Sequence, residues 1–318
     1  MRRLRIHNKI ARSNVTPLVC ALLAAGLWWL PSGSYDFGGI ISLALFLCTA
    51  YIVLEANNVF MILRVRSRMI TSVWLFCAAS LGMLHAFQPI MLAMFCLAVS
   101  YYVLFRTYQQ MQPVADVFHA FLMLSLGSVF YPPLLFFVPF YWWYLLVFMR
   151  CMSLRVFFAS LLGTILPYWF WLGWLLWQEN LSPFVAWWQG ISMGNIQNVA
   201  MYADKATALL HVPYFLLLFL SLWTTGYYFI YRYDDKIRTR MMFYIFIFQT
   251  SLIILFSLFM AEPMQVVPLL LLSLAPLLAH YFTLCNTLLS LVMFLLSVLA
   301  FLGVAFQTML PETFYKLC

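Results

Sequence analysis

The chain has 318 residues, of which 66% are hydrophobic and only 8% are charged, and its formal net charge is +8. So apolar a composition is typical of an integral membrane protein and excludes an ordinary water-soluble domain. The basic residues lie in short gaps between apolar runs, and too few lie elsewhere to build a phosphate-binding surface, so nucleic-acid binding is excluded as well.

Apolar runs that can form membrane-crossing helices follow one another along the chain. A hydrocarbon core of about 30 Å requires about 20 apolar residues in a helix. The candidate runs are 16–31, 38–54, 70–87, 90–105, 116–131, 133–149, 154–177, 208–231, 241–261, 264–282 and 286–309. Several are short and lie near Pro or Gly, so tilted or partly unwound segments leave the count open by one or two. The sequence therefore predicts an all-α, polytopic transmembrane helix bundle of about eleven spans.

The distribution of basic residues predicts the orientation of these spans. Of the seventeen Lys and Arg residues, only Lys205 and Lys316 fall on the side opposite to the N-terminus. Cytoplasmic loops carry an excess of Lys and Arg, so the N-terminus is predicted to be cytoplasmic. Basic side chains on this side can reach the phosphates of inner-leaflet lipids. The residues predicted to do so are Arg64, Arg66, Arg68, Arg150 and Arg155.

One integral membrane domain is predicted over residues 1–318, and its only sizeable stretch outside the membrane is an outer-side loop at 178–207. Within this loop, Phe184, Trp187, Trp188 and Ile191 follow the i, i+3, i+4, i+7 spacing of one helical face. This spacing predicts an amphipathic helix in the outer interface, with Trp at headgroup depth. Such a helix serves either as a simple anchor or as the wall of an outward-facing groove.

The few acidic residues on the outer side are the candidates for chemistry. Asp36 lies in the short, glycine-containing loop 32–39, where the backbone can turn tightly and bring a carboxylate close to the helix ends. A carboxylate in such a place can act as a general base toward an acceptor hydroxyl. The alternative is that these acids are solvated loop charges. The polar residues that could line a pocket with Asp36 are His85, Glu179, Asp204, Lys205, His211 and Glu262.

Other patterns argue against metal, cofactor and ion-coupled chemistry. No H-x-x-x-H or C-x-x-C pair occurs, so neither a metal site nor a cofactor is predicted. The span interiors are nearly free of ionisable residues, which disfavours a proton- or sodium-driven transporter. On the inner side, Asp234 and Asp235 are predicted to lie in a turn and to pair with Arg238 and Arg240 of the following helix.

The stretch from Phe118 to Leu176 carries three local motifs: S-L-G-S-V-F-Y-P-P, the R-x-x-x-x-R turn of Arg150 and Arg155, and a G-x-x-x-P-Y sequence beginning at Gly163. With these motifs the chain resembles an uncharacterised family of polytopic inner-membrane proteins from Bacteroidota. The resemblance covers most of the chain and implies a location in the bacterial cytoplasmic membrane, but it brings no established activity.

The same stretch is similar in layout to the middle of GT-C glycosyltransferases, membrane enzymes that use polyprenyl-phosphate-linked sugars. That superfamily places a catalytic Asp or Glu in the first outer loop, and Asp36 occupies the matching position. The chain departs from the pattern because this loop is only about eight residues long and holds one acid. The resemblance implies a layout, and fold-level analogy alone does not establish an activity.

Three functions remain open on the sequence. The first is a GT-C-like glycosyltransferase with Asp36 as its base and a polyprenyl-phosphate-linked sugar as its donor. The second is a non-catalytic subunit or scaffold of a cell-envelope assembly complex, with envelope proteins as partners. The third is a transporter of lipids or hydrophobic solutes, which requires no charged group at mid-membrane. All three predict contact with membrane lipids.

Overall fold

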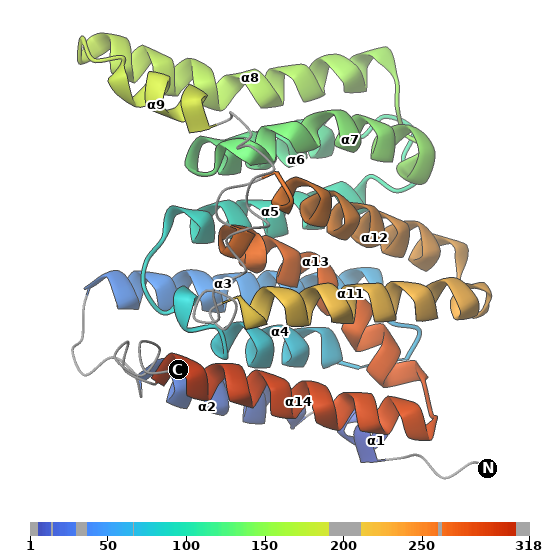
Figure 1. Ribbon diagram of the computed structural model, residues 1–318. Helices are drawn as coiled ribbons and strands as arrows, with labels where there is room; N and C mark the ends of the chain where they lie inside the picture. Colours follow the sequence, from blue (N-terminus) through green and yellow to red (C-terminus); the bar gives the residue numbers. More distant parts are fainter. Residues whose placement is uncertain are drawn as a thin grey trace. The chain divides into compact units, whose positions relative to one another are not determined.

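The computed structural model describes residues 6–13, 15–29, 37–65, 67–190, 211–259 and 263–309. Across these ranges every regular element is helical, which confirms the predicted all-α class (Figure 1). The chain forms two compact units: unit 1 comprises Met1–Phe87 and Asn195–Cys318, and unit 2 comprises Gln88–Gly194. Unit 2 is therefore inserted, in sequence, between the two halves of unit 1.

The helices fall into two classes by length. Within the described ranges, eight helical segments are long and apolar enough to cross a membrane: Phe37–Phe60, Pro89–Arg106, Pro132–Met149, Leu154–Trp177, Val212–Asp234, Ile237–Ser257, Pro263–Leu284 and Leu288–Gln307. Shorter apolar helices lie at Thr16–Trp28, Met69–Ala79 and Val114–Phe130. The chain is thus a multi-pass membrane protein by helix length and composition. The predicted number of about eleven crossings stays a prediction.

Unit 1 is built around one enclosed helix. Its elements are α1 (Ile6–Arg12), α2 (Thr16–Trp29), α3 (Phe37–Phe60), α4 (Met69–Ala79), η1 (Gly82–Leu84), α11 (Val212–Tyr231), η5 (Arg232–Asp234), α12 (Ile237–Ser257), η6 (Pro263–Val266), α13 (Val267–Leu284) and α14 (Leu288–Met309). Every residue of α13 from Val267 to Thr283 is buried. Helices α4, α11 and α12 pack on α13, which makes α13 the core of the unit.

Two polar contacts, one near each end of their shared length, hold α4 and its flanking residues against α3. At one end the Asn57 side-chain amide donates a hydrogen bond to the Ser67 carbonyl, at 2.7 Å. At the other end the Ser42 hydroxyl donates to the Leu84 carbonyl. The segment from Ser67 to Leu84 therefore runs antiparallel to α3. Although α4 has only 11 residues, α4 and η1 together cover the same distance as the middle of α3.

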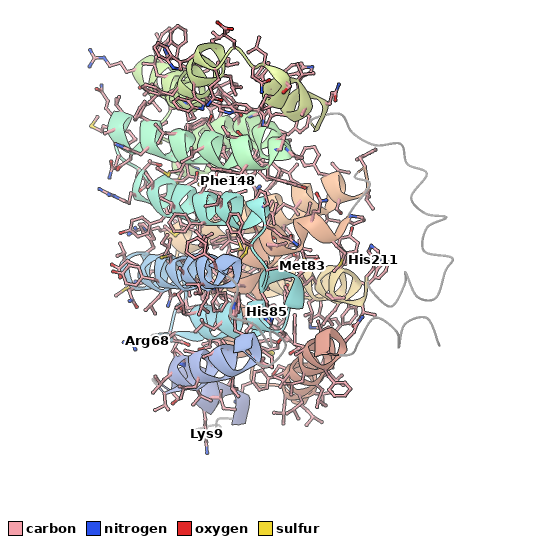
Figure 2. All side chains as sticks on the ribbon, turned by 90° about the vertical axis from the view of Figure 1, so that its left-hand side faces the viewer. Lys9, Arg68, Met83, His85, Phe148 and His211 are labelled. Atoms are coloured by element: carbon pink, nitrogen blue, oxygen red, sulfur yellow. The ribbon has the colours of Figure 1, made fainter. Side chains whose placement is uncertain are left out.

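Three basic segments of unit 1 meet at one end, which we call the basic end of unit 1. The Arg64 guanidinium donates to the Asp234 carbonyl at 3.0 Å and lies 3.8 Å from the Asp234 carboxylate. The Ser67 hydroxyl donates to the Ala11 carbonyl, so the end of α1 joins the same group. Lys9 of α1 is exposed and extends away from the ribbon (Figure 2). These contacts bring the basic segments 9–12, 64–68 and 232–240 to one end of the unit, and the side of the membrane that this end faces stays a prediction.

Unit 2 is a stack of helices in which α6 lies between α5 and α8 (Figure 1). Its elements are α5 (Pro89–Arg106), α6 (Val114–Phe130), η2 (Pro132–Phe137), α7 (Val138–Trp143), the π-helical turn η3 (Tyr144–Met149), α8 (Leu154–Trp177) and α9 (Ser182–Gly190). Small and hydroxyl residues allow close contact. The Ser125 hydroxyl donates to the Thr164 carbonyl at 2.6 Å, and the Ser100 hydroxyl donates to the Ala120 carbonyl at 2.8 Å.

The basic residues of unit 2 also share one end, the basic end of unit 2. Arg106 lies 3.6 Å from the Asp116 carboxylate, which joins the end of α5 to the start of α6. Arg155 donates to the Gln112 side-chain oxygen at 3.3 Å, which joins the start of α8 to the same segment. Arg150, in the left-handed region with φ 54°, lies in the connection that leads to α8. Helices α6 and α8 therefore both leave this end.

Candidate functional site

Much of the predicted outer pocket lies outside the described residues. This applies to the proposed base Asp36, to Asp204, Lys205 and Glu262, and to the predicted lipid contact Arg66. Their roles stay predictions. What the structure does describe is the surrounding frame, together with His85, His211 and Glu179.

His85 and His211 lie at the end of unit 1 opposite its basic end. His85 follows η1, and His211 directly precedes α11 (Figure 2). Since α11 continues into η5, which meets Arg64 at the basic end, its first residue belongs to the other end. The hydroxyls of Tyr214 and Ser257, 2.5 Å apart, join the start of α11 to the end of α12 there.

The imidazole of His85 is held and kept neutral by its surroundings. Its Nε2 lies 3.0 Å from the Ala79 carbonyl, and because a carbonyl can only accept, Nε2 must donate. The ring lies 4.5 Å from the Trp28 ring, centroid to centroid. Burial lowers the pKa of His85, and the bond to Ala79 offsets this only in part. A neutral imidazole with Nε2–H leaves Nδ1 as a hydrogen-bond acceptor.

The turn that carries His85 packs against the first turns of α3. A Cβ added at Gly39 would lie 3.7 Å from the His85 carbonyl oxygen, and Ser42 binds the Leu84 carbonyl. In sequence, α3 begins at Phe37, the residue after Asp36. The helix that follows the predicted base is thus anchored to the turn that holds His85.

The remaining predicted residues are exposed. Glu179 belongs to unit 2, where it follows α8 with φ 53°. Arg68, Arg150 and Arg155 are exposed at the basic ends of their units, as a role in lipid contact requires. Arg64 is also exposed but is engaged with Asp234. Whether these side chains contact lipid phosphates stays a prediction.

The helix predicted in the outer loop exists but packs differently from the expectation. Helix α9 turns its Phe184 and Trp187 toward α8, where Trp187 meets the rings of Tyr168 and Trp171 at 5.2 and 5.8 Å. The Trp187 indole donates to the Ser128 carbonyl of α6 at 2.9 Å. Trp188, in contrast, is 63% exposed and can reach lipid. The apolar face predicted to lie in the interface is therefore divided: Trp187 makes an internal contact and Trp188 is exposed. Ile191, the last residue of that predicted face, lies outside the described residues.

A pair of neighbouring substitutions tests this packing. We expect Trp187→Phe to loosen α9 from α8 and α6, because it removes the indole hydrogen bond, worth about 1 kcal/mol. Trp188→Phe, the matched control, should leave α9 in place. Limited proteolysis of the purified protein at 178–190 measures the difference. Equal cleavage rates in the two variants would contradict the internal role of Trp187.

A buried ionisable pair at the basic end of unit 1 was not predicted. Nε2 of His280, on α13, lies 2.8 Å from Oδ2 of Asp235, the residue between η5 and Lys236 at the start of α12. The two side chains are only 3% and 1% exposed. The carboxylate accepts the hydrogen bond, so Nε2 carries a proton. This contact ties the η5–α12 turn to the core helix.

The surroundings of the pair are aromatic and incompletely bonded. The rings of Tyr228 and Phe243 meet the His280 ring edge-on, at 5.1 and 4.8 Å between centroids. Oδ1 of Asp235 and the Tyr228 hydroxyl are both buried without a hydrogen-bond partner among the described residues. Arg232, Arg240 and Asp235 all lie close enough to Tyr228 to interact electrostatically with it.

The predicted pairing of the inner-side acids was therefore wrong. Helical spacing suggested Arg238 and Arg240, but Asp235 binds His280 and Asp234 meets Arg64. A local rule cannot find a partner 45 positions away. One signal was present in the sequence: His280 interrupts an otherwise apolar run, and ionisable groups in such runs usually have a partner.

Among the described residues, no group of three or more His, Cys, Asp or Glu side chains could hold a metal ion. No protein-family model, curated protein or solved structure matches this chain.

Proposed function

We propose that the chain crosses the bacterial cytoplasmic membrane eleven times, with the N-terminus and the basic ends of both units facing the cytoplasm. The three shorter apolar helices, α2, α4 and α6, support this count by the distance that each one covers within its unit. Helix α4 with η1 follows α3, as described above. Helix α6 follows α5 from the Arg106–Asp116 contact as far as Gly127, where an added Cβ would lie 3.1 Å from Cys96.

Helix α2 supports the same count. At one end, Thr16 donates to the Ile10 carbonyl at 2.6 Å, close in sequence to the Ala11 carbonyl that binds Ser67. At the other end, Trp28 reaches the ring of His85. The helix thus extends from the basic end of unit 1 to the opposite end. A short helix that covers this distance can cross a locally thinned bilayer.

We further propose that the outward-facing end of unit 1 carries a GT-C-like glycosyltransferase site that uses a polyprenyl-phosphate-linked sugar. The observation that supports it is the packing of the first turns of α3 on the turn that holds His85. A general base must be held within hydrogen-bonding reach of the hydroxyl that it deprotonates. Asp36 immediately precedes α3 in the sequence, and the helix that follows it is the one anchored to the turn of His85.

In the proposed reaction, Asp36 accepts the proton of an acceptor hydroxyl as its oxygen attacks the anomeric carbon of the sugar. The bond between that carbon and the phosphate oxygen breaks, and polyprenyl phosphate leaves with the electron pair. His211, at the same end of unit 1, is the proposed contact for the sugar. Lys205 is the proposed partner of the lipid phosphate, where a positive charge stabilises the leaving group.

Substitution of the proposed base is the direct test. In a strain that lacks the chromosomal gene, we expect Asp36→Asn to support transfer at least ~100-fold less efficiently than the unchanged chain, because a general base contributes at least about this factor. Asp234→Asn, which makes the same chemical change at the basic end, should restore it fully. The readout is the profile of envelope glycans and glycoproteins, with the amount of membrane-inserted protein measured alongside.

The alternatives have distinct outcomes. If deletion alters the glycan profile but Asp36→Asn restores it, Asp36 is not catalytic and the enzymatic proposal fails. Purification in mild detergent then decides further. A stoichiometric partner would favour a scaffold of an envelope complex, and a chain that purifies alone with bound lipid would favour a transporter of hydrophobic solutes.

A further inference from the structure

The Asp235–His280 pair of unit 1 takes no part in the proposed glycosyltransferase reaction. A buried carboxylate is costly unless it is paired and hydrogen-bonded. Here one oxygen binds His280, while the other has no hydrogen-bond partner among the described residues. Ionisable groups that face the interior of a membrane helix bundle commonly pair with one another and mark proton or ion pathways.

The charged groups around the pair come from a small part of the unit. Helix α11 contributes Tyr228, η5 contributes Arg232, and α12 contributes Arg240 and Tyr244. Of the other elements packed on α13, α1 carries Lys9 and Arg12, which are exposed. The described residues of α4, α14 and η6 include no Asp, Glu, His, Lys or Arg. The other acid nearby is Asp234 of η5, which is 67% exposed and lies beside Arg64 rather than in the buried site.

We propose that Asp235, His280 and Tyr228 form a proton-binding site of unit 1, loaded from its basic end. With Nε2–H of His280 bound to the carboxylate, the pair carries one negative charge. A proton from water can join Oδ1 of Asp235 or Nδ1 of His280, each of which has a lone pair, and either position makes the pair neutral. The Tyr228 hydroxyl, buried beside it, can donate to the empty Oδ1 or accept from it once it is protonated.

Two features of the site suit proton exchange. First, the pair is close to water in sequence and in space, because Asp234 and Lys236 on either side of Asp235 are exposed. Second, the rings of Tyr228 and Phe243 pack edge-on against the imidazole, so the pair itself is enclosed although its neighbours in sequence are exposed.

Proton binding has a mechanical consequence. The Asp235–His280 contact joins the η5–α12 turn to α13, and the strength of a charge-assisted hydrogen bond depends on the charges of both partners. Gain or loss of the proton therefore alters the attachment of the start of α12 to the core helix. This inference concerns the basic end of unit 1 and does not depend on glycosyl transfer at the other end.

The test is infrared difference spectroscopy of the full chain in lipid nanodiscs, between roughly pH 5 and pH 8, the range in which histidine-containing sites titrate. We expect the unchanged chain to show carboxyl and imidazole bands that are lost in both Asp235→Asn and His280→Gln. Asp234→Asn, the matched control, should retain them. Other titrating groups, including His85, are common to all variants and cancel in the comparison.

Tyr228→Phe keeps the proposal testable if Asp235→Asn and His280→Gln do not fold, since it removes only one hydroxyl. We expect it to alter the carboxyl and imidazole bands of the pair, because it removes the hydroxyl that is buried beside them. Tyr227→Phe should leave these bands unchanged. Absence of the bands in the unchanged chain, their persistence in Asp235→Asn or His280→Gln, or bands that Tyr228→Phe leaves unaltered would each overturn the proposal.

Discussion

Asp235→Asn is expected to destabilise unit 1 much more than Asp234→Asn, although the two substitutions are chemically identical and adjacent. The Asp235 side chain is 1% exposed and bound to His280, whereas the Asp234 side chain is 67% exposed and lies 3.8 Å from Arg64. Breaking a buried pair costs about 3–5 kcal/mol, whereas an exposed ion pair contributes at most about 1 kcal/mol. Unfolding in mixed micelles, followed by loss of helical circular dichroism, measures both.

A double-mutant cycle separates the contact from the individual residues. His280→Gln alone should also be strongly destabilising, and the double variant should be less destabilised than the sum of the single variants, with a coupling of about 0.5–3 kcal/mol. Additive effects of Asp235→Asn and His280→Gln would show that the two residues act independently. Equal effects of Asp235→Asn and Asp234→Asn would show that burial of the pair does not determine stability.

Gly163→Ala should weaken the packing of α8 on α6, whereas Gly173→Ala on the same helix should not. A Cβ at Gly163 would lie 2.5 Å from the Phe118 carbonyl oxygen, which is helical backbone and cannot rotate away. Nothing lies within 4 Å of the corresponding position at Gly173. Overpacking of this kind costs about 1–3 kcal/mol, while alanine in an open helical position is favoured over glycine by about 1 kcal/mol. Thermal unfolding of the two variants measures the difference.

Such close approach of two helices is what a glycine provides where no side chain fits between them. A Gly163→Ala variant as stable as Gly173→Ala would mean that α6 and α8 lie farther apart than the structure shows. Gly163→Leu offers a second comparison. It should be more disruptive than alanine at position 163, while Gly173→Leu should resemble Gly173→Ala.

The helices could be predicted from sequence because an apolar run long enough to cross a bilayer has few alternatives to a helix. The predicted run 154–177 agrees with α8, Leu154–Trp177. The run 70–87 was predicted to be continuous, but α4 ends at Ala79 and η1 follows. Hydropathy averages over windows and does not detect where the backbone tightens into a turn.

Side-chain contacts between distant segments were harder to predict. Helical periodicity correctly placed Trp187 and Trp188 on an apolar helix, yet periodicity cannot say which of two neighbouring residues another helix will cover. The partner of Asp235 depends on how α11, α12 and α13 meet, and that arrangement is specified by many apolar contacts rather than by any short motif. For the same reason Asp36 was found as a candidate without any knowledge of what faces it.

The insertion of unit 2 between the halves of unit 1 constrains how the protein is assembled during synthesis. Helices α2, α3 and α4 are translated well before α13, on which α4 packs. Until then α4, whose Thr71 and Ser72 end up buried, can pack on α2 and α3 but not on α13. Unit 2 is translated without interruption and can complete its packing during this interval, since compact units generally fold as they emerge. The packing of unit 1 is therefore completed only after unit 2 and the second half of unit 1 have been translated.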